Sequence, residues 1–114
     1  VKDTIHTTEL DTIYARGVEL LQKRKYAKAL YILNDYNDRN TVVAHLSLGH
    51  DERAMELLAT MPKDAVTEYL RAIACSRLGR KEEGLRHFLE ACRLDGRMEY
   101  RGNLDPEIAE LLKQ

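Results

Sequence analysis

The chain has 114 residues, of which 44% are hydrophobic and 32% charged, and its 18 basic and 19 acidic residues give a net charge of -1 at pH 7. This length favours one domain with a real core, and the composition is that of a charge-rich globular protein. The balanced charge argues against a general nucleic-acid binder, which needs a basic excess to displace counterions. No apolar run approaches the roughly 18 residues that a membrane span needs.

The spacing of apolar residues predicts about seven helices and no strand, so the expected fold class is all-α. The helices are expected at about 10–24, 26–37, 40–48, 51–60, 64–78, 81–94 and 104–113. Gly49 and Gly79 are placed to end helices, because glycine accepts the left-handed backbone conformation. Asp105 is an N-cap candidate in front of Pro106, which lacks only an N–H that has no partner at a helix start. The segment 96–103 is expected to be a polar connection.

A block of similar pattern recurs three times in the chain. It reads KYAKALYILNDY at 25–36, HDERAMELLATM at 50–61 and RKEEGLRHFLEA at 80–91. In each block a small residue precedes large apolar ones, and these small residues are Ala29, Ala54 and Gly84. The breaks before the blocks fall at Arg24, Gly49 and Gly79, with the same shifts of 25 and 30 residues. Such recurrence indicates stacked helical hairpins, which usually form a surface for holding a partner.

The blocks resemble tetratricopeptide repeats (TPRs), most clearly over 69–95. There the small, turn and aromatic positions of that family are matched by Ala72, Gly79, Gly84, Phe88 and Ala91. The resemblance implies a right-handed α-α superhelix with repeats at about 10–37, 38–62 and 64–95 and a capping helix at about 104–113. The shifts of 25 and 30 are shorter than the family period of about 34 residues, so the middle repeat is contracted. Because the chain begins at Val1, we expect a single domain over 1–114 excised from a longer protein, or a mature form.

In this family the first helix of each hairpin lines the concave face. The resemblance therefore implies a partner-binding set of Tyr14, Val18, Asn40, Val43, Tyr69, Ile73 and Arg77. This face is more apolar than a solvated one, which marks contact with something. The alternative is that these residues pack against the terminal helix or against other domains. One TPR subtype grips the carboxylate of a chaperone tail with basic and amide side chains, but only Asn40 fits that role, so such tails are not expected.

The sequence contains no nucleophile–base arrangement and no glycine-rich phosphate loop. Metal-ligand spacing is also absent among His6, His45, His50 and His87. We therefore predict no enzyme activity, no cofactor and no metal. Cys75 and Cys92 lie inside apolar helical patterns and are interpreted as small buried hydrophobes. A disulfide between neighbouring helices stays open if the protein is exported.

The predicted function is a non-catalytic protein–protein interaction module that binds a partner segment or a neighbouring domain through its concave face. The alternative is a structural spacer or self-association module within a larger protein. Nucleic acid is not expected as a partner, and neither is direct membrane insertion, because each apolar helix face has a neighbouring repeat to bury it. The sequence leaves the cytoplasm and the bacterial cell envelope both open as compartments.

Overall fold

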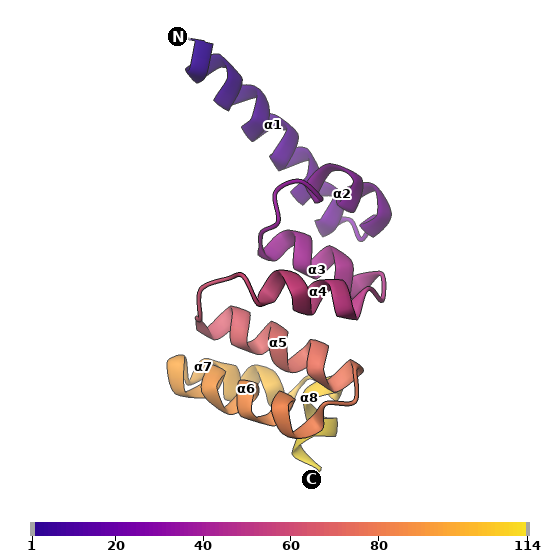
Figure 1. Cartoon of the computed structure of the whole chain (residues 1–114), viewed down its shortest axis with the longest axis vertical. Coiled ribbons are helices and arrows are strands. Elements are labelled where there is room, and N and C mark those ends of the chain that lie inside the picture. Colours follow the sequence, from indigo (N-terminus) through magenta and orange to yellow (C-terminus); the bar gives the residue numbers. More distant parts are fainter. Residues whose placement is uncertain (1, 114) are drawn as a thin grey trace. The chain divides into compact units, whose positions relative to one another are not determined.

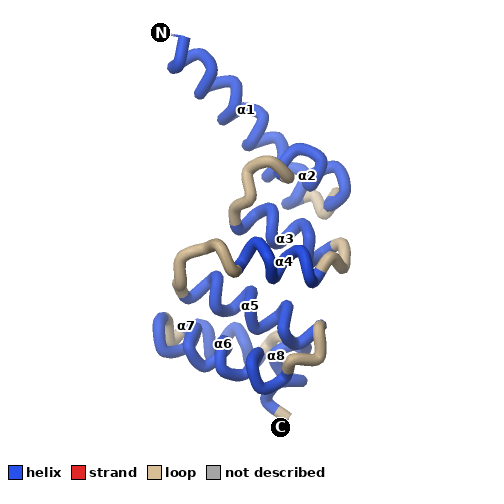
Figure 2. The backbone as a smooth tube through the Cα atoms, in the orientation of Figure 1, coloured by secondary structure: helices blue, strands red, loops and turns tan. Residues whose placement is uncertain are grey.

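The structure is a computed structural model that describes the backbone of residues 2–113 and the side chains of residues 12–113. Within these residues it contains eight helices and no strand, which confirms the all-α prediction (Figure 1, Figure 2). The chain divides into two compact units, Val1–His50 (unit 1) and Asp51–Gln114 (unit 2). The units are described separately, and a single TPR-like domain over the whole chain stays a prediction.

Unit 1 consists of α1 (Lys2–Gln22), α2 (Tyr26–Leu33) and α3 (Arg39–Ser47). Helix α1 begins well before the expected start near residue 10, because no glycine or proline interrupts this stretch and helix propagation needs no apolar periodicity. Helices α1 and α2 pack on each other, and α3 packs on α2. Leu20, Ala29 and Leu33 form a core cluster of α1 and α2, and Val42, Ala44 and Leu46 are the buried apolar residues of α3.

Unit 2 is built around α5. It consists of α4 (Asp51–Leu58), α5 (Ala65–Arg77), α6 (Lys81–Leu94), α7 (Arg97–Asn103) and α8 (Pro106–Leu112). In Figure 1, α5 lies between α4 and α6, and α8 packs against both α5 and α6. Helix α5 starts with a reciprocal capping box between Asp64 and Thr67. Because three neighbouring helices cover it, most of α5 from Thr67 to Cys75 is buried.

Helix α7 corrects one prediction, since Arg97–Asn103 is helical, whereas 96–103 was expected to be a polar connection. Its seven residues offer little apolar periodicity, and only Met98 and Gly102 are buried. Gly102 lies so close to the ring of Phe88 that a Cβ there would come within 2.4 Å of it. The helix is therefore specified by close packing on α6, which a sequence pattern does not reveal. The next helix starts as predicted, with Asp105 accepting a hydrogen bond from the Glu107 N–H at 3.0 Å.

The breaks after α1, α3 and α5 are turns of one kind. Arg24, Gly49 and Gly79 all have left-handed backbones, with φ of 61°, 80° and 77°. In each turn the next residue donates its N–H to the carbonyl five positions earlier. These bonds measure 2.8–2.9 Å and join Lys25 to Leu20, His50 to His45 and Arg80 to Cys75. The predicted helix ends at Gly49 and Gly79 are thus confirmed, and Arg24 adopts the same conformation without being glycine.

The pattern continues into the helix after each turn. Five residues after the turn stands the buried small residue Ala29, Ala54 or Gly84. Four residues later stands a large buried apolar residue, namely Leu33, Leu58 or Phe88. A small residue lets two helices approach closely, and the large one fills the space beside it. The recurrence in the sequence is therefore a recurrence of local structure.

Candidate functional site

Unit 1 brings two of the predicted site residues into direct contact. Tyr14 donates its hydroxyl hydrogen to the Asp38 carboxylate and accepts a hydrogen bond from Asn40 Nδ2 at 2.6 Å. Asp38 also caps α3 by accepting from the Thr41 N–H at 3.1 Å. Burial, followed by the hydrogen bond to Asp38, raises the pKa of Tyr14. These contacts tie α1 to the start of α3, so Tyr14 and Asn40 have a structural role in unit 1.

The two predicted valines of unit 1 are half-buried. Val18 packs beside the core of Leu20, Ala29 and Leu33. Val43 lies on α3 and is also half-buried. Each valine therefore presents only part of its side chain to solvent.

A shallow, open groove lies along α2 and the end of α3 in unit 1. It encloses about 760 Å³ and is lined by Ala27, Leu30, Tyr31, Asn34, Asp35, Leu48 and His50. The Tyr31 side chain is 91% exposed. None of these residues belongs to the predicted site, because the TPR resemblance directed attention to the first helix of each hairpin.

The predicted site residues of unit 2 face their own chain. Tyr69 is only 2% exposed, and its hydroxyl donates to Asp105 Oδ2 at 2.9 Å. The Arg101 guanidinium lies 4.6 Å from the centre of the Tyr69 ring. Ile73 is buried as well. These contacts agree with the alternative interpretation, in which this side of α5 packs against the terminal helices.

Arg77 is the third predicted residue of unit 2 and is held between two carboxylates. Its Nη1 lies 3.2 Å from Asp51 Oδ1 at the start of α4, and its Nε donates to Glu107 Oε1 at 2.8 Å. Beside it, the Ser76 hydroxyl donates to the Glu107 carbonyl oxygen at 3.1 Å. Arg77 therefore links α4, α5 and α8 of unit 2.

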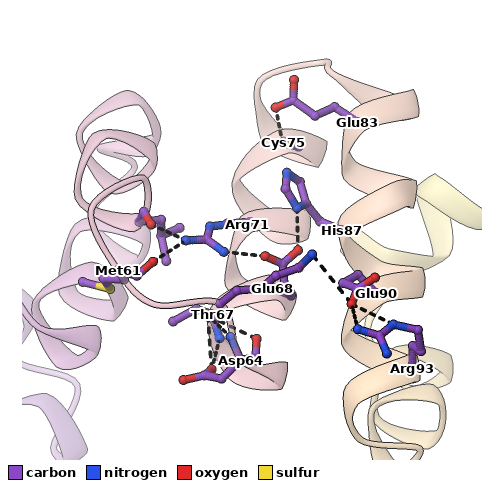
Figure 3. Close-up of polar contacts among 12 residues, drawn as sticks. Met61, Asp64, Thr67, Glu68, Arg71, Cys75, Glu83, His87, Glu90 and Arg93 are labelled. Atoms are coloured by element: carbon purple, nitrogen blue, oxygen red, sulfur yellow. Dashed lines mark hydrogen bonds and ion pairs between the residues drawn. The ribbon is translucent and has the colours of Figure 1, made fainter.

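A buried charge network that the sequence analysis missed lies on the other side of α5. The side chain of Glu68 is 3% exposed and forms an ion pair with Arg71 (Figure 3). Arg71 also donates to the carbonyl oxygens of Leu58 at 2.5 Å and Met61 at 3.0 Å, which anchors the end of α4. On its second oxygen Glu68 contacts His87 Nδ1 of α6 at 2.6 Å. A buried carboxylate needs such partners, because an unpaired buried charge is very costly.

A cluster of possible metal ligands adjoins this network. The donor atoms of Cys75, Glu83 and His87 all lie within 4.8 Å of one another. The Cys75 thiol donates to Glu83 Oε2 at 3.3 Å. Burial, followed by the hydrogen bond to Glu83, raises the pKa of Cys75 to about 12. The thiol is therefore protonated at neutral pH, which makes it a poor nucleophile.

The sequence contained a signal for this cluster. Cys75 and Glu83 stand four residues before and after the turn at Gly79, so a hairpin about that glycine places them opposite each other. Glu83 and His87 are four residues apart on one helix and therefore share a face. The prediction of no metal site rested on spacings among the histidines, which do not bring Cys75, Glu83 and His87 together.

The other histidines and the two cysteines were also singled out in the sequence. His45 and His50 straddle Gly49, yet their Nδ1 atoms lie 3.1 Å apart across the turn. His6 lies outside the residues whose side chains are described. Cys75 is a buried free thiol, as the interpretation of small buried hydrophobes expects, and Cys92 is a half-buried free thiol.

Across residues 2–113, no helix combines the length and the apolar character needed to cross a membrane. Comparison of the chain with protein-family models, curated proteins and solved structures found no match.

Proposed function

We propose that the chain is a non-catalytic protein-interaction module of the TPR type, in which unit 1 offers the surface for a partner segment. The support for a repeat is the threefold recurrence of one left-handed turn, a small buried residue and a large buried residue along the chain. A repeat of helical hairpins whose members pack on their neighbours usually serves as a binding surface.

The observation that carries the proposal is the groove of about 760 Å³ beside the exposed Tyr31. Tyrosine is enriched among the residues that dominate binding energy, because it offers a large, rigid and amphipathic contact. Leu30 and Leu48 are apolar residues of the groove lining, whereas Asn34 and Asp35 add hydrogen-bond acceptors. The groove therefore suits a partner segment that carries an apolar side chain flanked by hydrogen-bond donors.

The proposed interaction surface does not include α5, because Tyr69 and Arg77 already contact the terminal part of the chain. The residues of unit 1 from the predicted concave face, namely Tyr14, Val18, Asn40 and Val43, remain candidates for contact with a longer partner. Their hydrogen bonds and partial burial make them supporting positions, whereas Tyr31 is the anchor.

A second candidate function is a structural spacer or self-association module. One observation favours it, since α8 packs against α5 and α6 and leaves that side of unit 2 covered by its own chain. The two functions differ in what contacts Tyr31, which is another protein for an interaction module and a second copy of the chain for self-association.

Photo-crosslinking distinguishes these functions. Benzoylphenylalanine replaces Tyr31 in one variant and Tyr100, which is 72% exposed in unit 2, in a matched control. An interaction module gives a crosslink to a different protein from position 31 and none from position 100, in cells that produce the chain. A crosslink only between copies of the chain supports self-association. Equal crosslinking from both positions contradicts a groove-specific surface.

A further inference from the structure

We propose that Cys75, Glu83 and His87 form a zinc site that joins α5 to α6 in unit 2. The three side chains supply one sulfur, one oxygen and one nitrogen donor, a set that suits a borderline-soft divalent ion such as Zn²⁺. They converge in the space between the two helices, as Figure 3 shows.

The distances fit an ion of this kind after a small closure. With bonds of about 2.0–2.3 Å, tetrahedral zinc holds its ligand atoms about 3.3–3.7 Å apart. The Cys75 sulfur and Glu83 Oε2 are already 3.3 Å apart, and all three donor atoms lie within 4.8 Å. The widest pair therefore needs to close by about 1 Å.

His87 is oriented for metal binding by its other ring nitrogen. Because a carboxylate only accepts hydrogen bonds, the contact of 2.6 Å with Glu68 assigns the ring hydrogen to Nδ1. The Nε2 lone pair is then left for a metal, and Figure 3 shows that side of the ring turned toward Cys75. A histidine ligand that donates its second N–H to a carboxylate is the usual arrangement at zinc sites, and it raises the basicity of the ligand.

The carboxylate behind His87 is held in place by other side chains, and two of the three ligands are accessible to solvent. Glu68 is held by Arg71, which is itself anchored on the carbonyl groups of Leu58 and Met61. Cys75 is fully buried, whereas Glu83 and His87 are half-buried and reach solvent. Zn²⁺ can therefore enter from the solvent side, displace the thiol proton to water, and keep a water molecule as its fourth ligand.

The test uses the full 114-residue chain under reducing conditions, titrated with Co²⁺ and then Zn²⁺. We expect one equivalent of Co²⁺ to produce a thiolate-to-cobalt band in the near ultraviolet together with tetrahedral d–d bands, and Zn²⁺ to remove both. Cys75→Ala should abolish the thiolate band. Glu68 is the carboxylate behind His87, so Glu68→Gln should weaken Co²⁺ binding by roughly 10- to 100-fold. Glu83→Gln and His87→Gln each remove a ligand and should weaken it more than that.

Matched controls lie next to the site. Cys92→Ala removes the other cysteine, and Glu82→Gln changes the exposed neighbour of Glu83 on the same helix, so both should bind Co²⁺ like the unchanged chain. No thiolate band in the unchanged chain overturns the proposal, and so does a band that survives in Cys75→Ala or disappears in Cys92→Ala. If circular dichroism shows that Cys75→Ala does not fold, the pair Glu83→Gln and Glu82→Gln decides, and equal affinities for that pair overturn it.

Discussion

Unit 1 and unit 2 use the same turn-and-helix pattern, but one tyrosine of each unit, Tyr31 and Tyr69, lies in opposite surroundings. In unit 2, Tyr69 is 2% exposed because Phe88, Arg101 and Asp105 surround it. In unit 1, Tyr31 is 91% exposed beside an open groove. Tyr69 lies on the first helix of its hairpin, where Phe88 of α6, Arg101 of α7 and Asp105 before α8 cover it, whereas Tyr31 lies on the second helix of its hairpin. Whether an aromatic side chain is free for a partner therefore depends on its position in the hairpin and on the helices that pack on it.

The largest expected effect comes from replacing each of these two tyrosines by alanine. Tyr69→Ala removes a buried aromatic side chain and leaves a cavity, and should cost about 3–5 kcal/mol of unfolding free energy. Tyr31→Ala removes an exposed side chain and should change stability by less than about 0.5 kcal/mol. Urea denaturation followed by circular dichroism measures both variants.

The outcome also decides between the two interpretations of Tyr69. If Tyr69→Ala remains nearly as stable as Tyr31→Ala, the terminal helices contribute little to this side of α5, and Tyr69 regains its predicted place on a partner-binding face. A large loss of stability identifies it as a core residue, which is the role that its contacts indicate.

A second prediction tests the packing of α7, which distinguishes unit 2 from unit 1. A Cβ at Gly102 would approach the Phe88 ring to 2.4 Å, so Gly102→Ala should destabilise the chain by about 1–3 kcal/mol through overpacking. Nothing lies within 4 Å of a Cβ built on Gly96, which precedes α7. Gly96→Ala is therefore the matched control and should be close to neutral. Equal melting temperatures for the two variants would show that α7 is not held by this contact.

The sequence predicted most helix boundaries because local chemistry sets them. Gly49 and Gly79 take the left-handed conformation expected of them, and Asp105 caps α8 in front of Pro106. Helix α7 was missed because its position depends on the fit of Gly102 against Phe88, two residues whose contact is tertiary. Helix boundaries set by turn and capping residues were therefore predictable, whereas a helix that depends on tertiary packing was not.

The candidate sites were less predictable than the helices for the same reason. Glu68 looks like an ordinary charged residue in the sequence, and only the structure shows it buried between Arg71 and His87. Cys75 and Glu83 become neighbours only when the helices fold back about Gly79. Tyr31 could not be identified as exposed without knowing which side of α2 packs on α1 and α3.

A third prediction concerns the hydroxyl of Tyr69, whose pKa is raised by burial and then by the hydrogen bond to Asp105. Above pH 10 an unfolded tyrosine gives up its proton while folded Tyr69 keeps it, so the folded state binds more protons and stability falls as the pH rises. Tyr69 alone can lower the free energy of unfolding by at most about 1.4 kcal/mol per pH unit. Tyr69→Phe should cost about 1 kcal/mol at pH 7, where its hydrogen bond is lost.

The variant lacks the ionisable hydroxyl, so its stability should fall less steeply above about pH 10, and the gap to the unchanged chain should narrow. Denaturation curves between about pH 7 and pH 11 measure the two slopes. Parallel slopes would mean that Tyr69 ionises as easily in the folded chain as in the unfolded one, contrary to its burial in unit 2.

The smallest expected effect comes from making the first turn of unit 1 like the turn of unit 2. Arg24 holds a φ of 61°, a conformation that costs an L-residue about 1–2 kcal/mol, whereas Gly79 adopts φ of 77° freely. Glycine loses about 0.5–1 kcal/mol more backbone entropy on folding, so Arg24→Gly should stabilise the chain by roughly 0.5 kcal/mol. The mirror change, Gly79→Ala, should destabilise it by about 1 kcal/mol, since the added Cβ meets no neighbour and only the backbone conformation is strained. Both shifts are measurable as changes in the urea midpoint at constant slope. If Arg24→Gly destabilises instead, the Arg24 side chain supports the first turn through contacts that outweigh its backbone conformation, and the three turns would be alike in geometry but not in energetics.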